Sequence, residues 1–103
     1  MIAIRVRYTV KPEFVEKNKN NINAVMNDLR VLGNPHTKYM SFLEEDGKTF
    51  MHFAMYPDKE TADLVNGLSS FSKFRQELKA SKPEKAPQLE NLSLVGAGYK
   101  IFN

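Results

Sequence analysis

The chain has 103 residues, no cysteine and a formal net charge of +3, from 15 basic and 12 acidic residues. This length predicts a single domain over residues 1–103, and the lack of cysteine excludes disulfides and thiolate chemistry, which suits the cytoplasm. Scattered basic residues and the absence of a run of roughly 18 apolar residues argue against nucleic acid and membranes as partners.

The first predicted element is a strand over residues 2–10, where apolar and polar side chains alternate. Its apolar face would carry Ile2, Ile4, Val6, Tyr8 and Val10, and Arg5 and Arg7 would lie on the other face. Pro12 suits the first turn of a helix, and apolar residues at helical spacing continue to Leu32. The "GNP" stretch from Gly33 then ends this helix.

Two further strands are predicted over residues 37–45 and 48–56, joined by a hairpin at Asp46-Gly47. A second helix begins with Asp58 as its N-cap, and Gly67 breaks or bends it before a helical stretch that carries Phe71, Phe74 and Leu78. Residues 80–88 form a polar connector, and residues 89–102 a long final strand. The order βαββαβ predicts an α+β, ferredoxin-like fold with a four-stranded antiparallel sheet.

The hairpin fixes which side chains share a face of the sheet. With Asp46 and Gly47 as a two-residue loop, Glu45 pairs with Lys48, and Ser41 lies opposite His52. The more apolar face carries Met40, Phe42, Met51 and Phe53, and we expect it to meet the helices. His52 and Ser41 would then point away from the helices, where Ser41 or a water would satisfy the imidazole at a subunit contact. A catalytic Ser/His pair is the alternative, although the sequence offers no third group to orient it.

Several polar residues allow two interpretations. Asn18 either lies in an apolar ligand pocket or, as we expect, meets water at an overhanging end of the first helix. Arg5 and Arg7 either bind an anionic ligand or, as we expect, pair with acids across a dimer contact. Tyrosines such as Tyr39 and Tyr56 either line a pocket or simply pack with a satisfied hydroxyl. The two histidines lack carboxylates at ligand spacing, so we expect no metal site.

Three stretches resemble a known family: "YTVKPEFVE", "NPHTKYMSFLEEDGKTFMHFAMYPDKE" and "DKETADLVNGLSSFSKFRQEL". They are similar to the first strand's exit, the hairpin and the Phe-x-x-Phe helix of the antibiotic biosynthesis monooxygenase family, in the dimeric α/β-barrel superfamily. The resemblance implies a homodimer whose two sheets close into a barrel with the helices outside. The family includes cofactor-independent oxygenases acting on polyphenolic substrates, haem-degrading enzymes and small proteins without known chemistry.

The chain departs from this family at positions associated with chemistry. Where members commonly have Glu-x-Trp, this chain has Ala54 and Tyr56, and where they often have two histidines it has Val65 and Ser70. It contains no tryptophan, which the haem-degrading members use.

The resemblance leads to the hypothesis of a monooxygenase without a cofactor that acts on a small aromatic or apolar molecule. His52, Asn18 and Tyr39 would stabilise a substrate anion. The residues we expect to contact the ligand are Ser41, Tyr56, Arg5, Arg7, Phe71 and Phe74. The alternatives are a non-catalytic ligand-binding or stress-related module, and a structural interaction protein that does not use a pocket.

Overall fold

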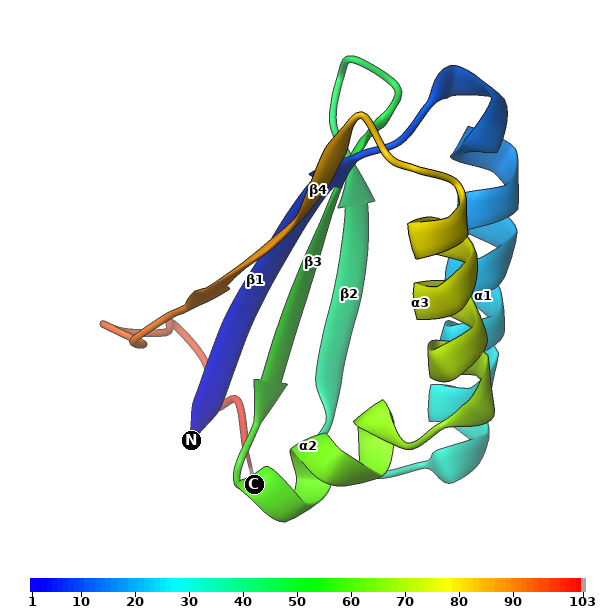
Figure 1. Cartoon of the computed structure of the whole chain (residues 1–103). Helices are drawn as coiled ribbons and strands as arrows, with labels where there is room; N and C mark the ends of the chain where they lie inside the picture. Colours follow the sequence, from blue (N-terminus) through cyan, green and yellow to red (C-terminus); the bar gives the residue numbers. More distant parts are fainter. Residues whose placement is uncertain (103) are drawn as a thin grey trace.

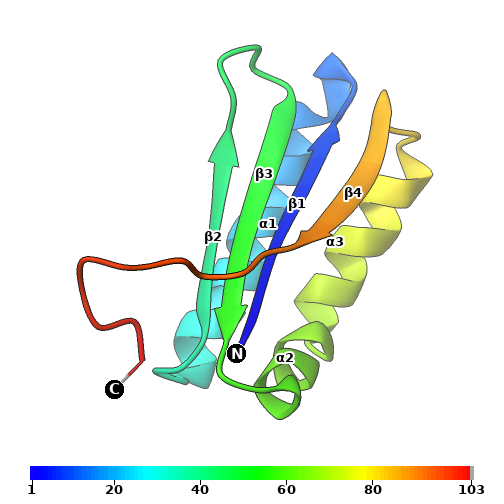
Figure 2. The ribbon, with the colours of Figure 1, turned by 90° about the vertical axis from the view of Figure 1, so that its left-hand side faces the viewer.

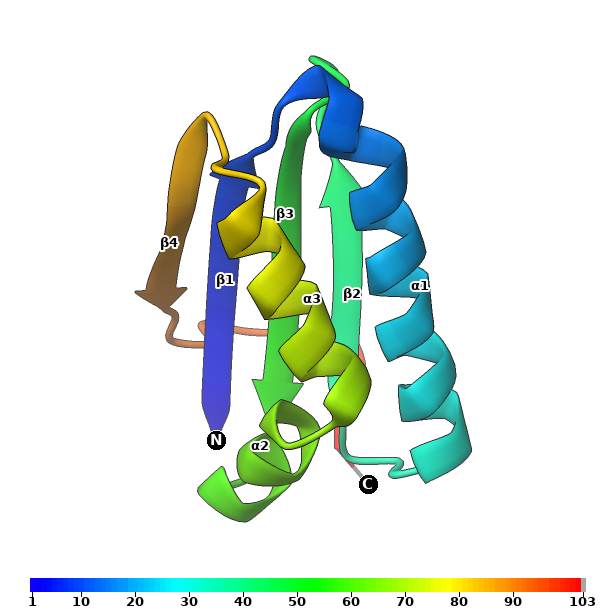
Figure 3. The ribbon, with the colours of Figure 1, turned by 45° about the vertical axis from the view of Figure 1, so that its right-hand side comes forward.

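The computed structural model describes residues 1–102 and contains one four-stranded sheet with helices on one side. The strands are β1 (Ile2–Thr9), β2 (Lys38–Leu43), β3 (Thr49–Tyr56) and β4 (Lys85–Asn91), in the order β2-β3-β1-β4 with every neighbouring pair antiparallel. The helices are α1 (Val15–Leu32), α2 (Lys59–Asn66) and α3 (Ser69–Ala80). Figures 1 and 3 show α1 and α3 side by side over the same face of the sheet. The predicted α+β, ferredoxin-like fold is confirmed.

The predicted helix boundaries are confirmed by their local chemistry. A 3₁₀ turn at Pro12–Phe14 precedes α1, whose end is capped by Gly33 with a positive φ of 64°. Asp58 is the N-cap of α2, since its carboxylate accepts a hydrogen bond from the Thr61 amide at 2.8 Å. The break at Gly67 separates α2 from α3.

The hairpin between β2 and β3 has the predicted register, with Ser41 opposite His52. The loop is longer than the predicted two residues, because the Glu44 amide donates to the Thr49 carbonyl across residues 45–48. Asp46 accepts hydrogen bonds from the amides of Lys48 and Thr49, and Gly47 has a φ of 76°. The predicted two-residue loop and the observed four-residue loop are centred on the same peptide bond, between Asp46 and Gly47. The longer loop therefore leaves the strand pairing unchanged.

The last strand lies earlier in the chain than predicted. β4 covers Lys85–Asn91, most of which the sequence predicts as a polar connector, and residues 92–102 are not in a strand. All seven residues of β4 are exposed, so no apolar alternation marks this edge strand, and Pro87 is tolerated there. In Figure 2 the tail that follows β4 runs across the sheet on the side away from the helices.

The assignment of the two faces of the hairpin is wrong in one respect. Phe50, His52, Ala54 and Tyr56 face the helices and are buried, whereas Met51, Phe53 and Met55 are only partly buried. Met40 and Phe42, which we expected beneath the helices, lie on the opposite face and are 48% and 50% exposed. We call that opposite side the open face.

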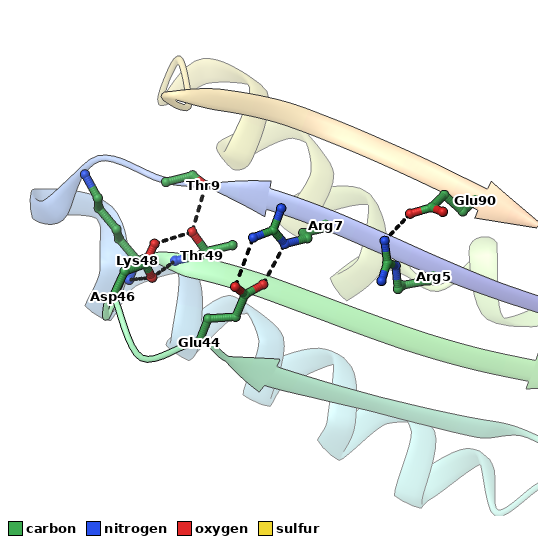
Figure 4. Close-up of polar contacts among 8 residues, drawn as sticks. All are labelled: Arg5, Arg7, Thr9, Glu44, Asp46, Lys48, Thr49 and Glu90. Carbon is green, nitrogen blue, oxygen red and sulfur yellow. Dashed lines mark hydrogen bonds and ion pairs between the residues drawn. The ribbon is translucent and has the colours of Figure 1, made fainter.

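The open face also carries paired charges. Arg7 binds Glu44 through Nε and Nη2 at 2.6 and 3.0 Å, and Arg5 pairs with Glu90 (Figure 4). Arg5 and Arg7 thus pair with acids of their own chain. Within residues 1–102, no helix combines the length and apolar character needed to cross a membrane.

Candidate functional site

Four side chains from four different elements form a continuous hydrogen-bonded chain beneath the helices. His52 on β3 contacts the hydroxyl of Tyr8 through Nε2 at 2.7 Å and the hydroxyl of Tyr39 through Nδ1 at 2.9 Å. Asn18 on α1 donates from Nδ2 to the Tyr8 hydroxyl at 2.9 Å. We call Asn18, Tyr8, His52 and Tyr39 the polar chain. Since β1 and β2 flank β3, their tyrosines reach the imidazole from both sides.

Two expectations about this region are therefore wrong. Asn18 is fully buried against the sheet and does not meet water, because α1 already lies over β1 at this point. His52 is satisfied by two tyrosines, not by Ser41 or by a subunit contact. The sequence does not identify Tyr8 as a partner of His52, because the register between β1 and β3 has to be known. In that register Val6 pairs with His52, and Tyr8 follows two residues later on the same face of β1.

The orientation of the Asn18 amide, with Nδ2 toward the Tyr8 hydroxyl, indicates where the protons of the polar chain lie. Tyr8 accepts from Asn18, and its own proton has His52 Nε2 as its acceptor. A neutral imidazole has one donor and one acceptor nitrogen, so Nδ1 carries the proton and donates to Tyr39. We infer that the hydroxyl proton of Tyr39 is left free for a further acceptor. With Asn18 Nδ2 facing Tyr8, the proton of Tyr8 would find no acceptor among the described residues in the other tautomer.

Burial keeps the polar chain uncharged at neutral pH. It lowers the pKa of His52 to about 4, because a charged imidazole would lose its hydration. Burial also raises the pKa of Tyr39 and of Tyr8 well above the ordinary range for a phenol, although the Asn18 hydrogen bond opposes the rise at Tyr8. Tyr39 therefore remains a hydrogen-bond donor in this environment.

The polar chain borders a cavity of about 480 Å³ between the sheet and α3. Apolar side chains from β1, β3, α3 and β4 form most of its walls, while Tyr8, Tyr39 and His52 supply polar atoms. This composition, mostly apolar with a few convergent polar groups, is that of a small-molecule site. The lining residues beyond these three are Ile4, Val6, Ala54, Tyr56, Asn66, Phe71, Phe74, Arg75, Leu78, Lys79, Pro83, Ala86, Pro87 and Leu89.

The cavity brings together some of the predicted site residues and leaves others out. Tyr39, His52, Tyr56, Phe71 and Phe74 line it, and Asn18 lies behind Tyr8. Burial raises the pKa of Tyr56 to about 12. The residues that the structure does not place at the cavity are Ser41, Arg5 and Arg7.

Two charged residues at the cavity were not selected from the sequence. Arg75 and Lys79 lie one turn apart on α3 and both line the cavity. Their i, i+4 spacing, in line with Phe71, is the signal that marks them as neighbours on one helical face. Across residues 1–102, no cluster of three or more metal-ligating side chains is found.

The family-associated positions differ in their surroundings. Ala54 and Tyr56, which stand where the family commonly has Glu and Trp, both line the cavity. Val65 is completely buried in the core, so that position offers no polar group.

No protein-family profile and no curated protein matches the chain. Solved structures do match it. One described as an antibiotic biosynthesis monooxygenase aligns with a TM-score of 0.78 at 15% identity, over 93% of this chain and 100% of that one. Rv0793 from Mycobacterium tuberculosis aligns with a TM-score of 0.78 at 14% identity, over 95% and 98%. A conserved protein from Methanosarcina mazei Go1 aligns with a TM-score of 0.70 at 20% identity, over 89% and 92%. The chain therefore has the fold of the antibiotic biosynthesis monooxygenase structures, as its sequence resemblance predicts.

Proposed function

We propose that the protein is a small monooxygenase that works without a cofactor on an aromatic or apolar molecule held in the cavity. The observation that carries this proposal is the Tyr39 hydroxyl, which lies 2.9 Å from His52 Nδ1 at the border of an apolar cavity and whose own proton we infer to be free. A phenolic oxygen of the substrate would accept this proton in a hydrogen bond. The apolar walls would exclude water and strengthen the interaction.

The role of the polar chain is to stabilise a substrate anion. His52 holds the Tyr39 hydroxyl by donating from Nδ1, while Tyr8 and Asn18 hold the tautomer of His52. A hydroquinone that has lost a proton is electron-rich and can reduce O2 itself. The balance is hydroquinone plus O2 to hydroxyquinone plus water, with one oxygen atom entering the ring and all electrons coming from the substrate.

Oxygen uptake with a panel of hydroquinones tests this proposal. Wild-type protein should consume O2 above the background rate and form a hydroxylated quinone. Tyr39→Phe should lower the rate by about 10- to 1,000-fold, since one donor to a developing anion is removed. Tyr99→Phe is the matched control, because Tyr99 is 76% exposed in the tail and does not line the cavity. Equal rates for wild type and Tyr39→Phe would contradict the role of Tyr39.

A non-catalytic ligand-binding or stress-related module is the second candidate. The observation in its favour is that apolar Ala54 and buried Val65 occupy positions where the resembled family has Glu and His. Such a module would gain thermal stability from aromatic ligands, because they bind only the folded state. Ligands that raise the melting temperature while O2 uptake stays at background would select this candidate over the enzyme.

We also propose that two copies associate through the open face. Its exposed Met40 and Phe42, and the exposed Leu94 and Val95 of the tail, supply apolar surface that a second copy would cover. The family resemblance implies the same arrangement. Light scattering should give a mass near twice that of one chain, and a monomer at micromolar concentration would contradict the dimer.

A further inference from the structure

We infer that the cavity selects an aromatic molecule with a carboxylate at its outer end and a hydroxyl or carbonyl oxygen at its inner end. This inference deepens the proposed function and rests on it, because the molecule would occupy the same cavity. It depends on two features of the cavity lining. The rim carries cations, and the buried border carries the free proton of Tyr39.

The rim of the cavity has an unbalanced positive charge. Arg75 and Lys79 are its only charged lining residues in the described chain, and no Asp or Glu lines it. Neither cation belongs to a salt bridge within residues 1–102, whereas Lys73 on the same helix lies 3.9 Å from Glu77. Two unpaired cations beside an apolar cavity attract an anion, because low-dielectric walls concentrate their field.

Two contacts hold the side chain of Arg75 where it can bind an anion. Its guanidinium lies 4.5 Å from the centre of the Phe71 ring, and Nη2 donates to the Asn66 carbonyl at 3.1 Å. Only one of its N–H groups is used by that bond, so others remain for a carboxylate, which a guanidinium fork matches well. Phe71 and Asn66 line the cavity too, so Arg75 is fixed at its edge.

The inner end of the cavity requires an oxygen acceptor. His52 is 3% exposed, and its Nδ1 lies 2.9 Å from the Tyr39 hydroxyl. In the tautomer inferred above, the Tyr39 hydroxyl proton is left for the ligand. Apolar side chains such as Val6, Ala54 and Leu78 line the same cavity. A rigid aromatic body with two polar ends fits this mostly apolar lining with cationic and hydroxyl groups, and a volume of about 480 Å³ accommodates two fused rings.

Three naphthalenes test the inference. They are 6-hydroxy-2-naphthoate, which has both polar ends, 2-naphthol, which lacks the carboxylate, and 2-naphthoate, which lacks the hydroxyl. Dissociation constants from ligand fluorescence or calorimetry should show the tightest binding for 6-hydroxy-2-naphthoate. The double variant Arg75→Gln/Lys79→Gln should weaken both carboxylates by about five- to thirtyfold and leave 2-naphthol unchanged, as two partly solvated ion pairs are lost. Tyr39→Phe should weaken the two hydroxylated compounds and spare 2-naphthoate.

Two controls keep the result specific. Lys73→Gln removes the same charge from the same helix but away from the cavity, so it should alter none of the three affinities. In wild type, raising the salt from about 0.01 M to about 1 M shortens the Debye length from about 30 Å to about 3 Å, and should weaken only the carboxylates.

The outcomes separate this inference from the proposed function. Equal affinities for 6-hydroxy-2-naphthoate and 2-naphthol, unchanged in the double variant, would overturn the preference for an anion and leave the cavity as a ligand site. An equal loss in Lys73→Gln would also overturn it, because the effect would then be one of net charge. Failure of all three compounds to bind would contradict both the inference and the proposed use of the cavity.

Discussion

The two faces of one sheet place polar groups in opposite ways. On the helix-facing side, His52 and Tyr8 are buried, uncharged and joined by short hydrogen bonds. On the open face, Arg7 and Glu44 are charged, paired and partly in water, next to the half-exposed Phe42. The difference shows that apolar composition does not decide which face is buried. On the buried face the polar atoms are uncharged and paired with one another, as buried polar groups usually are.

The largest expected difference between the two faces comes from replacing one phenylalanine on each face with alanine. Phe50 is 2% exposed and stacks on Tyr8, with ring centroids 5.7 Å apart. Phe50→Ala should therefore reduce the free energy of unfolding by about 3–5 kcal/mol, because a large buried cavity is created. Phe42→Ala, on the open face, should cost at most about 1 kcal/mol in a single chain. Urea unfolding followed by circular dichroism measures both.

The Phe42 variant also reports on the open face. A loss as large as that of Phe50→Ala, in a transition whose midpoint depends on protein concentration, would show that a second copy buries Phe42. Equal and small effects for both variants would contradict the assignment of the two faces.

The pH dependence of the unfolding free energy tests whether His52 is buried on the helix-facing side of the sheet. Burial lowers its pKa from 6.5 to about 4, so the folded state binds fewer protons than the unfolded state between these values. Its contribution to stability is complete above about pH 6.5 and is lost as the pH falls toward 4. Between about pH 7 and about pH 5 the loss should be about 2 kcal/mol.

His52→Gln provides the reference for this measurement. It should be less stable than wild type at pH 7, because Tyr8 or Tyr39 loses a partner. Its stability should also fall less between pH 7 and pH 5, which urea titrations at each pH would reveal. Parallel pH profiles for the two proteins would indicate a solvated imidazole and contradict its burial among the helices.

The sequence is informative where the interactions are local. Alternation in residues 2–10, the Asp58 cap and the Gly67 break each depend on a few neighbouring residues, and all are observed. The pairing of Ser41 with His52 depends only on where the loop is centred. It is therefore predicted correctly although the predicted loop is too short.

The errors concern interactions between distant segments. Met40 and Phe42 are more apolar than Ser41 and His52, so hydropathy alone favoured the wrong face. The deciding fact is that β1 pairs with β3 and places the apolar side of β1 beside His52, which no local pattern contains. β4 was missed for a similar reason. Its strand is specified by pairing with β1 rather than by its own exposed, polar residues.

The smallest expected effect belongs to the paired charges of the open face. Arg7→Gln removes both hydrogen bonds to Glu44, which hold the pKa of Glu44 below its usual range, but these groups are solvated. The variant should unfold at nearly the same urea concentration as wild type, and the small difference should vanish at high salt because the pair is screened. Lys19→Gln, which breaks a helix-surface pair with Glu16 far from the sheet, is the control. A loss in Arg7→Gln that clearly exceeds the control, persists in salt and grows with protein concentration would mean that a second copy covers this pair. The open face would then be a buried interface, and the contrast between the two faces would hold only for the isolated chain.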